Sequence, residues 1–278
     1  MVFEQITIVG VGLIGGSVGL AAKARNAARF VVGAGRDPNK LRKAESLGAI
    51  DLGTTDLAVA VQGSDLIVVC TPVDRIANTI LAAAPHCKRG AIFTDGGSTK
   101  LNIITALGDQ LPPGLRFVPA HPLAGSEKNG VENARADLFD KRLTILTPAV
   151  SDEAAERVAS FWKALGSRVV TMPADTHDRA LAYTSHLPHA VAAAVAGITP
   201  VDWLPLTAGG FRDVTRIAGG DPDLWTAIFQ ANRDAILAAL SQFRSRLEDF
   251  RRLVETGDGA GLHRWLAEAK QVRDALGT

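Results

Sequence analysis

Three short segments of this chain carry side chains that are suited to proton transfer and to anion binding. They are Asp95-Gly-Gly-Ser98-Thr-Lys100, His121-Pro-Leu-Ala-Gly-Ser126-Glu127 and Gly209-Gly-Phe-Arg212-Asp-Val-Thr-Arg216. The first two each follow a predicted strand. An imidazole at a strand end can act as a general base, because its ordinary pKa lies near the working pH of an enzyme. The competing interpretation of His121 is a loop histidine bonded to backbone, and the surrounding elements decide between the two.

The start of the chain is typical of a dinucleotide-binding turn. A β-branched run at 6–9 leads into Gly10-Val-Gly12-Leu13-Ile14-Gly15, and an Ala-rich helical stretch follows at 18–28. The first glycine permits the turn, the second lets the backbone approach a pyrophosphate, and the third lets the helix pack on the strand. The helix N-terminus offers free N–H groups to the anion. We therefore predict that Gly10, Gly12, Leu13, Ile14 and Gly15 bind a dinucleotide.

The second predicted strand bears on which dinucleotide is used. An acidic residue about 20 positions beyond the glycines normally binds the ribose, whereas an arginine there accommodates a 2′-phosphate. Gly35 stands where the acid is expected, and Arg36 follows it. We therefore expect NADP to be favoured, while Asp37 keeps NAD open as the alternative. A solvated loop charge is the other interpretation of Arg36.

Predicted strands and helices alternate as far as Met172 and then give way to helices alone. Further strand-like runs lie at 30–35, 65–71, 91–94, 116–119, 143–146 and 168–172. After Pro173 helical periodicity continues at 178–196, 222–253 and 261–276. This order predicts an α/β protein with a Rossmann-type doubly wound sheet over 1–172 and an all-α domain over 173–278. In such sheets ligands bind beyond the carboxyl ends of the strands, which favours catalysis for His121.

Composition excludes several classes of partner and site. The chain has 278 residues, 47% of them hydrophobic, and a formal net charge of +1, so no global field recruits nucleic acid or a membrane surface. The uncharged stretch 180–201 contains two histidines and two prolines and is a poor spanning helix. Cys70 and Cys87, with no C-x-x-C, suit a reducing compartment and give no support for a disulfide framework or a zinc site. We expect a cytoplasmic protein without a metal.

Together the motifs resemble the prephenate/arogenate dehydrogenase family over nearly the whole chain. Besides the glycine turn and the three segments above, the resemblance rests on Thr71-Pro72-Val73 and Ser185-His186-Leu-Pro-His189. It implies oxidative decarboxylation of prephenate or arogenate with hydride transfer to NAD(P), a step of tyrosine biosynthesis. It also implies a homodimer formed through the helical domain, and cofactor contacts at Thr71 and Pro72.

The resemblance assigns roles to individual residues of the chain. His121 looks like the base that polarises the ring hydroxyl, and Ser98 is similar to the serine that orients this histidine and the hydroxyl. Arg216 resembles a guanidinium that holds a substrate carboxylate, and His186 a second histidine that binds substrate. Four further residues look like parts of the pocket or its rim, with Trp225 reaching the partner subunit's pocket: Ser126, Glu127, Arg212 and Trp225.

Several alternatives stay open at this point. A β-hydroxyacid dehydrogenase would share the fold, but it normally uses a lysine of the helical domain, and none occurs between Lys163 and Lys270. A non-catalytic nucleotide sensor is the second alternative. Ser185 has an interpretation as a helix N-cap, and Lys100 as a helix-end charge.

Overall fold

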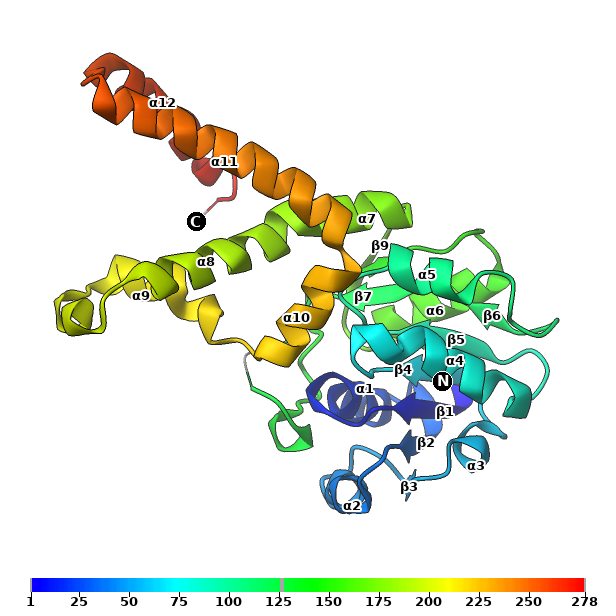
Figure 1. The fold of residues 1–278 in the computed structure, drawn as a ribbon. Coiled ribbons are helices and arrows are strands. Elements are labelled where there is room, and N and C mark those ends of the chain that lie inside the picture. The colour runs from blue at the N-terminus through cyan, green and yellow to red at the C-terminus, as the bar shows by residue number, and fades with distance from the viewer. Residues whose placement is uncertain (1, 126–127, 278) are drawn as a thin grey trace. The chain divides into compact units, whose positions relative to one another are not determined.

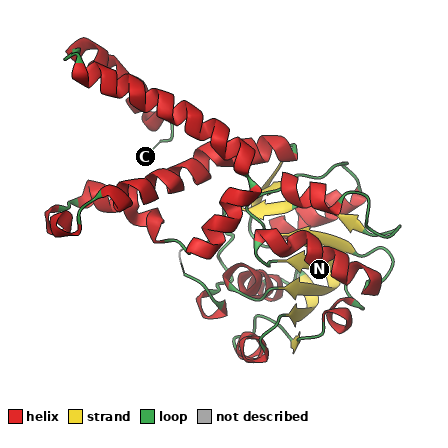
Figure 2. Ribbon diagram, in the orientation of Figure 1, coloured by secondary structure: helices red, strands yellow, loops and turns green. Residues whose placement is uncertain are grey.

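The computed structural model describes residues 2–125 and 128–277. It divides into two compact units, Met1–Asn232 and Arg233–Thr278. Figure 1 follows the chain through its elements, and Figure 2 distinguishes the strands of the first unit from its helices.

A six-stranded parallel sheet forms the nucleotide-binding half of the first unit. Its strands are β1 Phe3–Val9, β2 Ala28–Ala34, β3 Leu52–Thr54, β4 Leu66–Val69, β5 Ile92–Asp95 and β6 Arg116–Phe117. They lie in the order β3-β2-β1-β4-β5-β6, so the direction of winding reverses between β1 and β4. That reversal is the switch point at which doubly wound sheets bind ligands. The predicted Rossmann-type fold is confirmed.

Successive strand residues point to opposite sides of this sheet, and each side is buried in an apolar cluster. Ile6 and Ile8 belong to one apolar cluster, which also contains Trp162, whereas Val9 belongs to the other. Helices cover the faces: α1 Leu13–Ala24, α2 Pro38–Ser46, α3 Leu57–Val61, α4 Ile76–Ala83, α5 Leu101–Leu107 and α6 Glu153–Ala164. Short 3₁₀ turns lie at Val73–Arg75, Ala84–His86 and Val131–Asn133.

The later strands form a second sheet rather than extending the first, which corrects the expectation of one continuous series. It contains β7 Ala120–Pro122, β8 Leu143–Leu146 and β9 Arg168–Thr171, with β7 antiparallel and β9 parallel to β8. His121 lies in the middle of β7, opposite Ile145, and not in a loop beyond a strand. Pairing with β8 therefore holds the backbone of this residue.

Further helices of the first unit follow the second sheet. They are α7 Ala174–Leu181, α8 Leu187–Ile198, α9 Gly209–Thr215 and α10 Pro222–Ala231, with 3₁₀ turns at Val201–Leu206 and Arg216–Gly219. Of these helices, α7 and α10 pack against the sheet half. Asp178 of α7 accepts hydrogen bonds from the backbone N–H groups of Lys100 and Leu101, and Ile228 of α10 joins the apolar cluster beneath β4 and β5. The first compact unit therefore ends at Asn232. The predicted boundary between two domains at residue 172 stays a prediction.

The second unit is a pair of helices, α11 Arg233–Glu255 and α12 Gly259–Asp274. The connecting turn contains Gly257 with a φ of +66°, a backbone conformation that favours glycine. Trp265 of α12 contacts Phe250, and Arg246 lies over the indole ring. In the described part of the chain, no helix has the length and apolar character needed to cross a membrane.

Candidate active site

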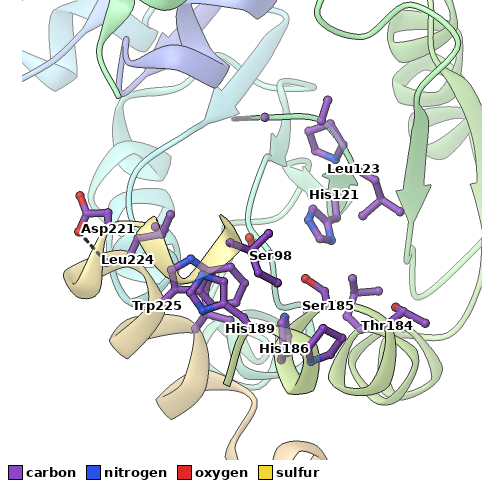
Figure 3. A pocket seen from close by; sticks show the side chains of 18 of the residues that line it. Ser98, His121, Leu123, Thr184, Ser185, His186, His189, Asp221, Leu224 and Trp225 are labelled. Carbon is purple, nitrogen blue, oxygen red and sulfur yellow. Dashed lines mark hydrogen bonds between the residues drawn. The ribbon is translucent and has the colours of Figure 1, made fainter. Parts of the chain in front are cut away.

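A pocket of about 700 Å³ lies wholly within the first unit and gathers most of the predicted chemistry. Its lining includes Ser98, His121, Ser185, His186, His189, Arg216 and Trp225. Figure 3 shows His121 and Ser98 around the same hollow as the two histidines of the α8 region. These residues come from three distant parts of the sequence, so their convergence is a result of the tertiary fold.

His121 is buried and is oriented by a second histidine. Its Nδ1 lies 2.8 Å from Nε2 of His177, and Nδ1 of His177 lies 2.7 Å from Oδ1 of Asp178. Within the described residues no hydrogen bond joins Ser98 to His121. The orienting partner of His121 is therefore His177, while Ser98 contributes its hydroxyl group to the pocket wall.

The environment keeps His121 in its neutral form. Burial lowers the pKa of His121 well below its usual 6.5, and the positive charge that His177, Lys100 or His186 bears when protonated acts in the same direction. A neutral imidazole has one nitrogen with a lone pair, so it can accept a proton at neutral pH. Because Nδ1 is occupied by His177, Nε2 is the nitrogen left for a ligand.

A buried ion pair holds the strand that carries His121. The ammonium of Lys100 pairs with Asp95 at the end of β5, and both side chains are fully buried. Lys100 also donates to the Ala120 carbonyl over 2.7 Å, and Asp95 accepts from the Ala120 N–H over 2.9 Å. Burial lowers the pKa of Lys100, opposed by the charge of Asp95. Lys100 is thus a structural tie between the two sheets: it does lie at a helix end, the N-cap of α5, but its charge is buried and paired there.

A π-helical turn, Ala182–His186, joins α7 to α8 and places residues on the pocket wall. Pro188 follows directly, and in a straight α-helix its ring would clash with the carbonyl four residues earlier. A π turn widens the backbone at that point, as it often does at functional sites. Ser185 lies inside this continuous helix, so its interpretation as a helix N-cap is wrong.

His186 is fixed through Asn232, at the end of α10. The Asn232 amide nitrogen lies 3.0 Å from Nδ1 of His186 and donates to the Asp178 carbonyl over 2.8 Å. Burial lowers the pKa of His186 to about 4, with the charge of Asp178 opposing the shift. His186 is therefore also neutral at pH 7.

Trp225 lines the pocket of its own chain. Its ring stacks on His189 with centroids 3.5 Å apart, and Nε2 of His189 is buried with no hydrogen-bond partner among the described residues. An unpartnered buried polar atom at a pocket wall indicates a place for a ligand atom. The structure thus places Trp225 in the pocket of its own chain, and the expectation that it reaches a partner subunit's pocket stays a prediction.

The remaining predicted substrate contacts differ in whether the structure places them in the pocket. Arg216 lines the pocket, and its guanidinium has no ion pair or hydrogen bond within the described residues. Arg212 is exposed on α9 and is not part of the pocket lining. Ser126 and Glu127 lie outside the described residues.

The glycine turn fits a dinucleotide at each of its three positions. Gly10 has a φ of +94°, and an added Cβ would lie 2.8 Å from the Cys70 carbonyl oxygen at the end of β4. An added Cβ at Gly15 would lie 2.2 Å from the Gly10 oxygen, whereas one at Gly12 would meet nothing within 4 Å. The open position is thus the one at which a pyrophosphate approaches.

Two further features support a bound anion at this turn. Helix α1 begins at Leu13 without a side-chain cap, so its first N–H groups are not satisfied by a side chain. Oγ1 of Thr71 is buried beside the turn and has no partner in the part of the chain that is described. Pro72 follows it and precedes the 3₁₀ turn at Val73–Arg75.

The turn and the pocket meet at Ile14. An added Cβ at Gly96 would lie 3.4 Å from Cγ2 of Ile14, and one at Gly125, a residue of the pocket lining, would lie 3.9 Å from its Cδ1. A dinucleotide held by the glycine turn would therefore lie next to the pocket.

The end of β2 presents Arg36 to solvent, with no ion pair or hydrogen bond in the described part of the chain. Asp37 caps α2 instead, because its carboxylate accepts from the N–H groups of Asn39 and Lys40. The acid that kept NAD open thus already has hydrogen-bond partners.

Sequence reasoning missed the residues behind the pocket wall, namely Asp95, Lys100, His177, Asp178 and Asn232. His189 stood inside a quoted motif without being assigned a role. The adjacent His177 and Asp178 at the start of a helix were a weak local signal, because only the fold reveals that both are buried. No group of three or more histidine, cysteine, aspartate or glutamate residues in the described ranges is arranged to hold a metal ion.

Comparison with known proteins agrees with this geometry. The family described as prephenate dehydrogenase, nucleotide-binding domain, matches residues 18–171, and its dimerization domain matches residues 173–268. A cyclohexadienyl dehydrogenase of Zymomonas mobilis is 36% identical over 288 residues, covering 100% of this chain and 97% of that protein. A prephenate dehydrogenase of Bacillus subtilis is 33% identical, covering 98% of this chain and 76% of the relative.

Solved structures of prephenate dehydrogenases are also similar to this chain. A prephenate dehydrogenase from A. aeolicus, in complex with hydroxyphenyl propionate and NAD+, superposes with a TM-score of 0.90 at 30% identity over 98% of each chain. A 3-hydroxyisobutyrate dehydrogenase from Salmonella typhimurium has a TM-score of 0.60 at 16% identity, which shows a shared fold alone. This chain belongs to the prephenate dehydrogenase family.

Proposed function

We propose that this protein oxidatively decarboxylates prephenate or arogenate, using a nicotinamide dinucleotide as hydride acceptor. The observation that carries the proposal is a buried, neutral His121 in a pocket that also holds the unpaired Arg216 and adjoins the glycine turn. A neutral base, a cation available to bind a carboxylate and a dinucleotide turn suit the oxidation of an anionic alcohol.

The roles of the side chains follow from their positions. Both substrates carry a hydroxyl at C4 and a carboxylate at C1 of the ring. Nε2 of His121 polarises the hydroxyl O–H bond, and Ser98 offers a second hydrogen bond to the same oxygen. Arg216 holds a carboxylate through two parallel hydrogen bonds. The unpartnered Nε2 of His189 is a further contact for the substrate.

The glycine turn, Thr71 and Pro72 would hold the dinucleotide, whose nicotinamide supplies the acceptor for the hydride of C4. The C1–carboxylate bond breaks as carbon dioxide leaves, and its electron pair completes the aromatic ring. The wall formed by the buried His186 and His189 and the half-buried Trp225 excludes water from this centre. Exclusion of water strengthens each electrostatic contact inside the pocket.

The finer choice of cofactor is NADP. Three features support it: Gly35 replaces the usual acid, Arg36 is exposed and unpaired within the described residues, and Asp37 is engaged as a helix cap. A guanidinium fork matches phosphate geometry.

The protein also acts as a homodimer in this proposal. The match to a dimerization domain supports it. So does a run of exposed apolar side chains beyond α8, in which Ile198, Val201 and Leu206 are each more than three-quarters exposed. Exposed apolar patches of this kind mark interaction surfaces.

The test is a direct assay. The purified protein is mixed with prephenate or arogenate and with NADP or NAD, and the absorbance of the reduced cofactor is followed. His121→Asn is expected to abolish turnover and to leave cofactor affinity nearly unchanged, because the side chain lies beyond the glycine turn. His86→Asn, at an exposed site outside the pocket lining, is the matched control. Wild-type turnover in His121→Asn would contradict the proposal, as would oxidation of 3-hydroxyisobutyrate in place of both ring substrates.

A further inference from the structure

The two pocket imidazoles, His121 and His186, are connected to one residue behind the pocket wall. We propose that Asp178 sets opposite tautomers on them, so that His121 presents a lone pair at Nε2 and His186 presents an N–H at Nε2. His177 and Asn232 transmit this choice and are positioning residues. The tautomers follow from the hydrogen-bond geometry of neutral rings, whereas their use in catalysis rests on the proposed function.

The Asp178 side chain is the fixed starting point. Its Oδ1 accepts from the Lys100 N–H and its Oδ2 from the Leu101 N–H, each over 2.8 Å. A carboxylate carries no hydrogen and can only accept. Its third neighbour, Nδ1 of His177 at 2.7 Å, must therefore carry a proton.

The hydrogen bond with His177 determines the tautomer of His121. A neutral His177 with a proton on Nδ1 has a lone pair on Nε2. That atom lies 2.8 Å from Nδ1 of His121, so Nδ1 of His121 must donate. The remaining nitrogen of His121, Nε2, then has a lone pair and faces the pocket as an acceptor. The logic is that of an aspartate–histidine pair, lengthened by one imidazole.

The backbone carbonyl of Asp178 sets the tautomer of His186 through Asn232. The Asp178 carbonyl can only accept, so the Asn232 group at 2.8 Å is its NH₂ group and the amide orientation is fixed. The other hydrogen of that NH₂ group points to Nδ1 of His186, 3.0 Å away. Nδ1 of His186 is therefore an acceptor, and a neutral His186 carries its proton on Nε2.

Other charged groups around the two rings do not disturb this order. Lys100 and Asp95 neutralise each other behind β7, and His189 on α8 stacks on Trp225. Burial lowers the pKa of both His121 and His186, so both stay neutral. The pocket thus contains one acceptor and one donor imidazole with fixed roles.

The pairing dictates how a substrate lies. A hydroxyl group must donate to His121, and an anionic or carbonyl oxygen must face His186. When the hydroxyl proton moves to His121, the O–H bond breaks and an Nε2–H bond forms. The resulting imidazolium still donates through Nδ1 to His177, whose own N–H group points to the Asp178 carboxylate. The relay therefore stabilises the charge that forms during catalysis.

Nitrogen-15 NMR of the full protein tests the tautomers without substrate. The chain has only six histidines, and ring ¹⁵N shifts separate protonated from unprotonated nitrogens. We expect a proton on Nδ1 of His121 and on Nε2 of His186 at pH 7. The opposite tautomer at either ring would overturn the proposal, whether or not the protein turns over prephenate.

Variants of His177 test the function of the relay. His177→Leu removes the acceptor and is expected to lower kcat about 100-fold, as outer partners of catalytic histidines do, with the KM for the cofactor unchanged. His177→Gln offers an amide oxygen to Nδ1 of His121 and should recover kcat to within about tenfold of wild type. The matched control is His86→Gln, on an exposed turn, which should behave as wild type.

The outcomes separate the two proposals. A loss of kcat of at least about tenfold in His177→Leu, with rescue by glutamine, supports the relay, and a smaller loss or no rescue overturns it. Asn232→Leu should leave the ¹⁵N shifts of His121 unchanged while His186 loses its single tautomer. If the wild-type protein does not oxidise either ring substrate, the proposed function fails, but the NMR result still decides the tautomers.

Discussion

At the scale of single residues, burial makes the histidines of this site useful. His121 and His186 are almost entirely buried, and desolvation lowers the pKa of each, so they remain neutral where an exposed imidazole would be partly charged. A neutral ring can accept or donate a defined hydrogen bond, and the partners His177 and Asn232 decide which. The same burial makes the free energy of unfolding depend on pH.

That dependence appears as acid sensitivity. His186 has a pKa of about 4 in the folded protein against 6.5 when unfolded, so between these values the unfolded chain binds the extra proton. Stability is therefore present above pH 6.5 and is lost as the pH falls toward 4. The free energy of unfolding should fall by about 3 kcal/mol over this window from His186, and His121 adds in the same direction. Denaturant titrations at a series of pH values measure the slope, which should be shallower in His186→Gln; an equal slope would contradict the assignment.

Arg36 carries the prediction on cofactor choice. Arg36→Ala should lower kcat/KM with NADP by the equivalent of about 1.5–3 kcal/mol, because a hydrogen bond to a charged group is lost, and should leave NAD almost unaffected. Steady-state kinetics with both cofactors give the ratio. Arg29→Ala, at the opposite end of the same strand, is the control. An unchanged ratio in Arg36→Ala would refute the NADP preference.

At the scale of elements, the nucleotide turn was predictable and the relay was not. Gly15 approaches Gly10 within the same turn, so the local sequence contains most of the signal, although Gly10 itself lies against Cys70. Lys100 is different, because its partners Asp95 and the Ala120 carbonyl meet only when β5 and β7 come together. His121 likewise lies in a strand of a second sheet, a pairing that no local periodicity encodes. The π turn before Pro188 arises from a conflict between helix and proline, and its position depends on packing.

A pair of alanine substitutions separates folding from binding at the turn. Gly15→Ala places a Cβ 2.2 Å from a backbone oxygen, so overpacking should lower stability by about 1–3 kcal/mol. Gly12→Ala meets no atom within 4 Å and should leave the melting temperature unchanged, yet it should weaken dinucleotide binding by blocking the pyrophosphate. Thermal unfolding and cofactor titration of both variants provide the comparison. Tight cofactor binding by Gly12→Ala would show that the dinucleotide does not approach this glycine.

At the scale of the whole molecule, apolar surface is left over after each unit has formed its core. Ile198 and Leu206 are 80% and 81% exposed in the first unit, and Val272 is 72% exposed in the second. A formal net charge of +1 gives little repulsion between copies of the chain. Both features favour self-association over a monomer, in agreement with the match to a dimerization domain.

The mass in solution tests this association. Sedimentation equilibrium should give about twice the chain mass of 29.2 kDa, because the apolar segment beyond α8 needs a partner to cover it. Leu206→Arg puts a charge into that segment and should shift the equilibrium toward monomer, since an unpaired charge is costly to bury. Val59→Arg, at an exposed apolar site on α3, is the matched control and should remain dimeric. A wild-type protein that sediments as a monomer at all concentrations would refute the dimer, and an unchanged dimer in Leu206→Arg would place the interface elsewhere on the chain.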